Sequence, residues 1–179
     1  MNIIRPDFPK DMKVFFNNLI NYLDTDLFFY GSVNRPDYVH NQSDIDVAVF
    51  TDNEYSMMAK LQHYLQVTRE AFDKVVWKLD GQIIYGYKIK CDKHLNSKCE
   101  IVVYNNDFKE VLLPEMRRCN TIPFFINCIL AILKTLHYTL HLLPKKQYSD
   151  CKRFLFNHVM ADKQDSIFYL IKQVKDIAT

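Results

Sequence analysis

Residues 43–50 read SDIDVAVF, an apolar and β-branched run that contains two aspartates. Side chains alternate between the two faces of a β-strand, so Asp44 and Asp46 project from one face while Ile45 and Val47 project from the other. Two ionised carboxylates about 4 Å apart repel each other by about 4 kcal/mol at an effective dielectric constant near 20. A core strand that keeps both charges therefore needs a cation, and a divalent metal ion is the simplest one.

Two flanking segments supply further groups that suit a metal and phosphate site. Upstream, FFYGS at residues 28–32 is an apolar strand that stops at Gly31 and is followed by Ser32. Glycine lets the backbone approach a phosphate closely, and the turn after it offers N–H groups and a hydroxyl as donors. Downstream, EIVVY at residues 100–104 opens with Glu100, which completes a set of three carboxylates if the two strands are neighbours. Such a set, together with substrate phosphates, suits magnesium.

The front of the chain mixes helical and strand periods. Apolar residues recur at helical spacing over residues 10–23 and 54–66. The apolar segments 75–79 and 83–89 flank Asp80-Gly81 and are predicted to form a hairpin. These elements, with the three strands already described, predict a small mixed β-sheet with flanking helices.

The rear of the chain has helical periods, and Pro144 is expected to end its long apolar helix. Helices are predicted over four segments: 107–118, 122–143, 147–160 and 165–177. The predicted fold class is therefore α+β. A catalytic core is expected at residues 1–105, followed by a C-terminal helical segment at 106–179.

Charge and composition indicate an intracellular, cytoplasmic protein. The chain has no run of 18 uncharged apolar residues and no N-terminal pattern of a signal peptide, so no membrane partner is expected. Its five cysteines include no Cys-x-x-Cys pair and are interpreted as reduced thiols. The net charge of +2 is uneven, because residues 1–105 carry 12 Lys/Arg against 14 Asp/Glu and the remainder carries 11 against 7. A basic rear beside an acidic front suits a site where metal ions and phosphates meet.

Taken together, FFYGS and SDIDVAVF resemble the signature of the DNA polymerase β-like nucleotidyltransferase superfamily, and the compact length is similar to its minimal members. The resemblance implies that Gly31 and Ser32 hold a nucleoside triphosphate. It also implies that Asp44, Asp46 and, as third carboxylate, Glu100 bind Mg²⁺ or Mn²⁺, with two ions expected. The activity implied is untemplated transfer of a nucleoside monophosphate to an acceptor hydroxyl on a protein, a small molecule or an RNA end, with release of pyrophosphate.

Basic residues are expected to complete the nucleotide site. Arg35 stands where many relatives carry a basic residue, but it precedes Pro36, which favours extended backbone at Arg35 and a late start of the helix that usually follows Gly-Ser. A triphosphate carries about four negative charges, more than the metal ions neutralise beside three carboxylates. We therefore expect a cluster in the helical half to fold back and close a cleft over the nucleotide: Lys145, Lys146, Lys152 and Arg153.

Two other functions are compatible with the sequence. Arg153 and His158 in RFLFNH have the R-x4-H spacing of HEPN ribonucleases, although the same spacing is common on a solvated basic helix face. The chain could also be a non-catalytic nucleotide-binding module, a hypothesis against which the intact Asp-x-Asp pattern argues.

Overall fold

The computed structural model describes residues 5, 7–79, 81–95, 97–118, 123–159 and 167–171. A six-stranded sheet lies at its centre, with strand order β1-β2-β5-β4-β3-β6. Strands β2 and β5 run parallel, and the other neighbouring pairs run antiparallel, so the sheet is mixed as predicted. Its strands are β1 (Phe28–Tyr30), β2 (Ile45–Thr51), β3 (Asp73–Leu79), β4 (Gln82–Lys90), β5 (Cys99–Asn105) and β6 (Ile167–Ile171).

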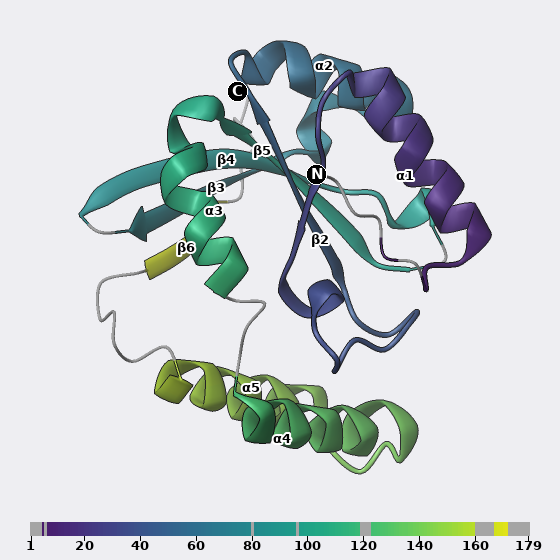
Figure 1. The fold of residues 1–179 in the computed structure, drawn as a ribbon, viewed down its shortest axis with the longest axis vertical. Helices are drawn as coiled ribbons and strands as arrows, with labels where there is room; N and C mark the ends of the chain where they lie inside the picture. Colours follow the sequence, from purple (N-terminus) through teal and green to yellow (C-terminus); the bar gives the residue numbers. More distant parts are fainter. Residues whose placement is uncertain are drawn as a thin grey trace, which may run out of the picture.

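The helices form separate layers around this sheet (Figure 1). Helices α1 and α2 cover one face, α3 covers the other, and α4 and α5 lie side by side beyond one end of the sheet (Figure 1). Their bounds are α1 (Lys10–Leu23), α2 (Glu54–Leu65), α3 (Lys109–Arg118), α4 (Phe124–Lys134) and α5 (Lys145–Val159). None of the helices in the described part of the chain has the length and apolar character needed to cross a membrane.

Alternation along β2 and β5 divides the core into two clusters. Ile45, Val47 and Val49 face α1 and α2, where they pack with Phe16, Leu19 and other apolar residues. The intervening positions face α3, whose Leu112 and Met116 belong to the second cluster. Helix α3 therefore shares a hydrophobic core with the strands of the sheet, although it follows residue 105 in the chain. The helices that lie beyond the end of the sheet begin at Phe124.

The structure corrects two of the predicted helices. The helix expected over 122–143 ends as an α-helix at Lys134 and continues as a π-helical turn over Thr135–Thr139. The Thr135 hydroxyl donates a hydrogen bond to the Ala131 carbonyl at 3.0 Å, a local bond that competes with regular helix geometry. The turn is followed by a left-handed residue at His141, so the chain reverses ahead of Pro144.

The second correction concerns the helix expected over 165–177. Residues 167–171 form strand β6, which pairs antiparallel with β3, while 165–166 and 172–177 lie outside the described residues. The segment reads IFYLI, whose β-branched and aromatic residues favour a strand when an open sheet edge is near. The helix prediction failed because the hydrophobic period of a segment carries no information about a distant pairing strand, here β3.

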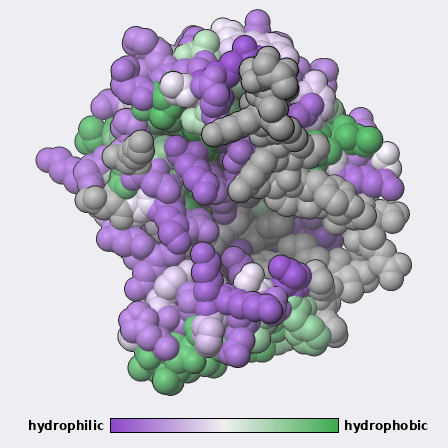
Figure 2. All heavy atoms as spheres, turned by 180° about the vertical axis from the view of Figure 1, so that it is seen from behind, coloured by the Kyte–Doolittle hydropathy of each residue, from purple (hydrophilic) through white to green (hydrophobic). Residues whose placement is uncertain are grey.

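Among the side chains that the structure describes in α4 and α5, Ile126 and Leu130 pack with Leu155 in a small apolar cluster. Several large apolar side chains of this helical pair are exposed, including Phe125 at 61%, Ile132 at 60% and Phe154 at 62%. Hydrophobic residues accordingly gather at the lower end of the molecule in Figure 2, where α4 and α5 lie in Figure 1. The apolar contact between the two helices is therefore small over the side chains that the structure describes.

Close packing at Gly86 gives a stability prediction. A Cβ atom at this position in β4 would lie 2.7 Å from two ring atoms of Tyr104 and 2.8 Å from the Val103 carbonyl oxygen. The Tyr104 hydroxyl accepts a hydrogen bond from Trp77, the single tryptophan, at 3.0 Å, so the ring cannot move without losing that bond. We expect Gly86→Ala to lower the free energy of unfolding by about 1–3 kcal/mol, measured by urea denaturation with circular dichroism and Trp77 fluorescence.

Gly81 in the same hairpin is the matched control. Its φ of 78° is left-handed, but nothing lies within 4 Å of an added Cβ. Asparagine tolerates left-handed backbone, so Gly81→Asn should cost less than about 1 kcal/mol. Equal losses in the two variants would contradict the packing explanation.

Candidate active site

Strand register places the predicted acidic residues in one row across the sheet. Asp46 of β2 pairs with Glu100 of parallel β5 and with Tyr30 of β1, and Glu100 pairs with Lys90 of β4. Paired residues on neighbouring strands project from the same face, so these four side chains share the face that α3 covers farther along. Asp44 lies just before β2 and projects, by strand alternation, to the same side.

Gly31 allows the backbone to approach this row closely. A Cβ on Gly31 would lie 2.8 Å from Asp46 Oδ2, and its φ of 73° is in the left-handed region. Two independent reasons thus require glycine here, the backbone conformation and the neighbouring carboxylate. The next residue, Ser32, donates a hydrogen bond from its hydroxyl to the Asp44 carbonyl at 3.2 Å, which ties the turn to the start of β2.

The turn continues as a 3₁₀-helix over Gly31–Asn34, so the helix begins directly at the glycine and the expected late start is wrong. Arg35 is extended, with φ −108° and ψ 158°, as its position before proline predicts. Pro36 therefore ends the short helix and does not delay it.

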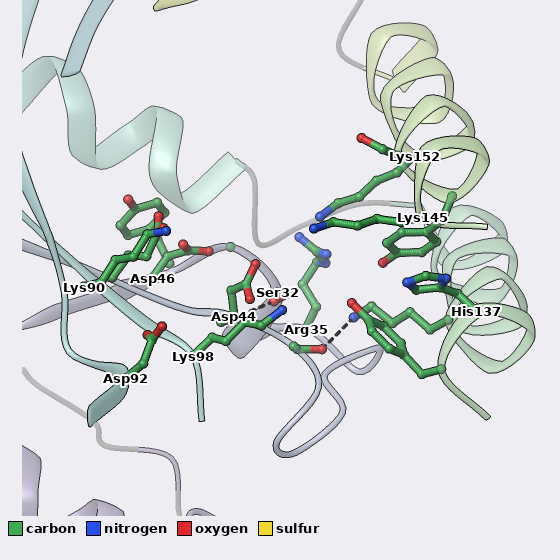
Figure 3. A pocket seen from close by; sticks show the side chains of 18 residues that line it. Ser32, Arg35, Asp44, Asp46, Lys90, Asp92, Lys98, His137, Lys145 and Lys152 are labelled. Carbon is green, nitrogen blue, oxygen red and sulfur yellow. Dashed lines mark hydrogen bonds between the residues drawn. The ribbon is translucent and has the colours of Figure 1, made fainter. Parts of the chain in front are cut away.

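A pocket of about 750 Å³ opens between this end of the sheet and the helical pair (Figure 3). Its sheet side includes the Gly-Ser turn and the three carboxylates, and its other side comes from α4, the π-helical turn and α5. The lining residues are Tyr30, Gly31, Ser32, Arg35, Ser43, Asp44, Asp46, Lys90, Asp92, Lys98, Glu100, Lys134, His137, Tyr138, Lys145, Tyr148, Ser149 and Lys152.

Asp46 has a strongly perturbed acidity. Burial, together with the neighbouring carboxylates of Glu100 and Asp44, raises the pKa of Asp46 from its ordinary value of 3.8 to about 6, while Lys152 and Lys88 oppose the shift. The ionised cluster is therefore electrostatically unfavourable by itself, which is the condition a bound cation would relieve.

The third carboxylate has a partner on the sheet. Glu100 Oε2 lies 3.1 Å from Lys88 Nζ in a partly buried ion pair. Within the described residues, no group of three His, Cys, Asp or Glu side chains already has an arrangement that could hold a metal ion. The donor chemistry of Asp44, Asp46 and Glu100 still fits a hard divalent cation, since all three carry carboxylate oxygens at one end of adjacent strands and the surroundings of Asp46 favour added positive charge.

Arg35 lies at the pocket wall and is almost fully buried, at 4% exposure. Its Nε donates to Asp37 Oδ1 at 2.8 Å, and its Nη2 donates to Asp37 Oδ2 at 3.2 Å. The fork-shaped pair orients the guanidinium beside the Gly-Ser turn.

The structure separates the four basic residues of the helical half. Lys145 and Lys152 line the pocket and extend toward the side that holds Asp44 and Asp46 (Figure 3). Lys146 and Arg153 are not among the lining residues. Arg153 is exposed and lies 3.9 Å from Asp150 on its own helix. The side chain of His158, the other residue of the R-x4-H pattern, is outside the described residues.

Helical spacing explains this division. Lys145, Tyr148, Ser149 and Lys152 are related by steps of three and four residues and form one stripe of α5 facing the pocket. Lys146 and Arg153 are each one residue further on, a rotation of about 100° around the helix. The helical period of KKQYSDCK, residues 145–152, already indicates that these four residues lie on one face.

The sequence interpretation missed the contribution of α4 and the π-helical turn. Lys134, His137 and Tyr138 line the pocket with the same three-and-four spacing. The His137 ring stacks on Tyr148 with centroids 4.6 Å apart and planes 7° apart, and its Nδ1 lies 2.6 Å from the Leu143 carbonyl oxygen. Because π-helical turns often accompany functional sites, the interruption after Lys134 is consistent with a role in the pocket.

The mixed sheet, the glycine turn and the carboxylate row define a nucleotidyltransferase-type fold. Comparison with known protein families matches the nucleotidyltransferase domain over residues 13–123, which is more than half of the chain. The chain therefore belongs to the nucleotidyltransferase domain family. Comparisons with curated proteins and with solved structures gave no significant match.

The raised pKa of Asp46 predicts how the metal-free protein responds to pH. The unfolded chain releases this proton near 3.8 and the folded protein releases it near 6, so folding binds a proton between these values and stability falls as pH rises through the window. In EDTA at pH 7.5, Asp46→Asn should raise Tm by about 2–4 °C, the shift that about 1 kcal/mol produces in a chain of this size. The difference should shrink toward zero at pH 4.

Thermal melts followed by circular dichroism at both pH values test this prediction. Asp24→Asn, a change at an exposed helix end that is not part of the pocket lining, controls for the loss of one negative charge. A gain for Asp46→Asn that is equally large at pH 4 would show that ionisation of the buried Asp46 carboxylate is not its cause.

Proposed function

We propose that the protein transfers a nucleoside monophosphate from a nucleoside triphosphate to an acceptor hydroxyl, without a template and with a divalent metal requirement. The observation that carries the proposal is the placement of Asp46 beside Glu100 on adjacent parallel strands, against the Cα of Gly31. A close backbone turn next to a carboxylate cluster suits a phosphate chain held by metal ions. Membership of the nucleotidyltransferase domain family supports the same activity.

In this proposal the triphosphate lies along the Gly-Ser turn. The Ser32 hydroxyl and the buried Arg35 guanidinium are on one side of it, and Lys145 and Lys152 of α5 are on the other. Cations on two walls favour a ligand with several negative charges. Lys146 and Arg153 face elsewhere and are not assigned to the nucleotide.

Asp44, Asp46 and Glu100 would hold two divalent cations, Mg²⁺ or Mn²⁺. When bound, these ions would lower the pKa of the acceptor hydroxyl and neutralise charge on the pyrophosphate leaving group. The three carboxylates fit this role because they are oxygen donors whose mutual repulsion needs a positive charge between them.

The reaction forms a bond between the acceptor oxygen and the α-phosphorus and breaks the bond from that phosphorus to the bridging oxygen of the β-phosphate. Pyrophosphate leaves, and the acceptor proton passes to a carboxylate oxygen, for which Glu100 is the proposed base. Lys145 and Lys152 would stabilise charge on the departing pyrophosphate. The acceptor is a hydroxyl on a protein, a small molecule or an RNA end.

Transfer of an α-phosphate label tests the activity directly. Each of the four ribonucleoside triphosphates, labelled at the α-phosphate, is incubated with the protein, Mg²⁺ or Mn²⁺ and a cell extract as the source of acceptor. We expect a labelled product with the wild type, none with Asp44→Asn or Asp46→Asn, and a decrease of about a hundredfold or more with Glu100→Gln. A parallel reaction with γ-labelled triphosphate should give no labelled acceptor.

Two results would contradict the assignment. Label transferred only from the γ-phosphate would indicate a phosphotransferase, and unchanged transfer by either aspartate variant would remove those carboxylates from the mechanism. Saturable triphosphate binding without any transfer would favour the non-catalytic nucleotide-binding module.

The α5 stripe gives a separate binding prediction. Triphosphate with Mg²⁺ should raise the Tm of the wild type in a concentration-dependent manner, because a ligand bound only by the folded state stabilises it. Lys145→Ala/Lys152→Ala should weaken affinity about tenfold or more, equivalent to about 1.4 kcal/mol. Lys146→Ala/Arg153→Ala removes the same charge from the same helix and is the matched control. Equal weakening by both double variants would mean that net helix charge, not the pocket-facing stripe, attracts the nucleotide.

A further inference from the structure

A buried ion cluster joins the helical pair to the loop between the Gly-Ser turn and β2. Lys134, the last residue of α4, is 5% exposed, and its Nζ lies 2.8 Å from Asp37 Oδ2. The same Nζ donates to the Asp37 carbonyl at 2.5 Å and to the Ser43 hydroxyl at 3.0 Å. The Lys134 side chain thus contacts both ends of loop 35–43, which leads from the Gly-Ser turn to Asp44.

Asp37 is shared between the two halves of the protein. On the loop side it accepts two hydrogen bonds from Arg35, and on the helical side it pairs with Lys134. Burial disfavours its charge, but the hydrogen bonds from Arg35 and Lys134 hold the pKa of Asp37 below its ordinary value. Removing charges from water is costly unless they are paired with good geometry, so a cluster of this kind specifies one arrangement of the groups it joins.

This arrangement matters because of where Lys134 lies in the chain. The π-helical turn that carries His137 begins at the next residue, and α5 with Lys145 and Lys152 follows it. Lys134 therefore ties the end of α4, and the segment that leads into α5, to loop 35–43 through buried polar contacts, which can fix the orientation of the pair.

We propose that Lys134 is a positioning residue whose buried ion pair with Asp37 holds the α4–α5 pair against loop 35–43, so that Lys145 and Lys152 face the nucleotide turn. The part of this inference that concerns nucleotide affinity rests on the proposed function. The part that concerns the position of the helices does not.

The alternative is that Lys134 acts only as a direct phosphate ligand, since it lines the pocket. The two roles differ in the nucleotide-free protein and in how mutations combine. A direct ligand leaves the helices unchanged without nucleotide and adds its effect to that of Lys152. A positioning residue alters the helices without nucleotide, and its loss removes the benefit of Lys152 as well.

The test uses Lys134→Met, which keeps most of the side-chain volume and leaves Asp37 paired with Arg35. Hydrogen exchange of the nucleotide-free protein should increase at amides of 124–134 and 145–159 and stay unchanged in β2 and β5. Affinity for an unreactive ATP analogue with a methylene group between the α- and β-phosphates, measured with Mg²⁺, should fall about tenfold. Lys152→Ala should weaken affinity clearly in the wild type and less than twofold in the Lys134→Met background.

Lys60→Met is the matched control, because Lys60 also donates from a partly buried Nζ to a backbone carbonyl of another helix, that of Leu23 at 3.1 Å, but is not part of the pocket lining. It should change neither exchange in α4–α5 nor affinity. If Lys134→Met is not recovered folded, Lys134→Gln, which keeps a neutral donor, takes its place with the same expected directions.

The outcomes separate this inference from the proposed function. Unchanged exchange in α4–α5, or fully additive effects of Lys134→Met and Lys152→Ala, would overturn the positioning role. Increased exchange in a protein whose wild type binds no triphosphate would support the anchor and contradict the nucleotide site instead.

Discussion

Repulsion between carboxylates at one end of two parallel strands is the constraint around which the rest of the structure is organised. Strand register holds the backbone of Asp46 beside that of Glu100, and chain connectivity keeps Asp44 close to both, so the three carboxylates remain in one region. Nearby lysine side chains compensate part of this repulsion. Lys88 pairs with Glu100, and Lys152 acts on Asp46 from the opposite wall. Burial, together with the repulsion from Glu100 and Asp44, nevertheless raises the pKa of Asp46. Such a cluster favours added positive charge, and Gly31 lets the backbone of the adjacent turn lie close to Asp46.

The helical pair turns this row of charges into a pocket. A sheet edge with a glycine turn is open on one side, and the second wall comes from α4, the π-helical turn and one stripe of α5. The described apolar cluster between α4 and α5 is small, and the buried cluster of Arg35, Asp37 and Lys134 adds polar contacts between this pair and the loop next to the pocket. Loop 35–43 therefore links two walls of the pocket, since it contacts Lys134 of α4 and leads directly to Asp44 and strand β2.

Elements whose partners are close in sequence or whose patterns are strong were predictable. The apolar strand ending at Gly31, the Asp-x-Asp strand, the hairpin and the two amphipathic helices before residue 66 all follow from local periodicity. Prediction failed where a distant partner or a local competing bond decided the outcome. Segment 167–171 became a strand because the edge of β3 is available to it, and the long rear helix changed geometry after Lys134. The basic residues of α5 were recognised as a group, but only their helical phase determines which of them face the pocket.

By itself the sequence determined the fold class, the family and the chemical types present at the site, because glycine after an apolar strand, combined with paired aspartates in the next strand, is far more specific than either pattern alone. The tertiary structure decided which groups share a pocket. The pairing of Asp46 with Glu100 depends on strand register, and the contact between Asp37 and Lys134 joins residues 97 positions apart. Local hydrophobic periodicity predicts neither contact. The first depends on how the strands pair, and the second on how the helical pair packs against the rest of the protein.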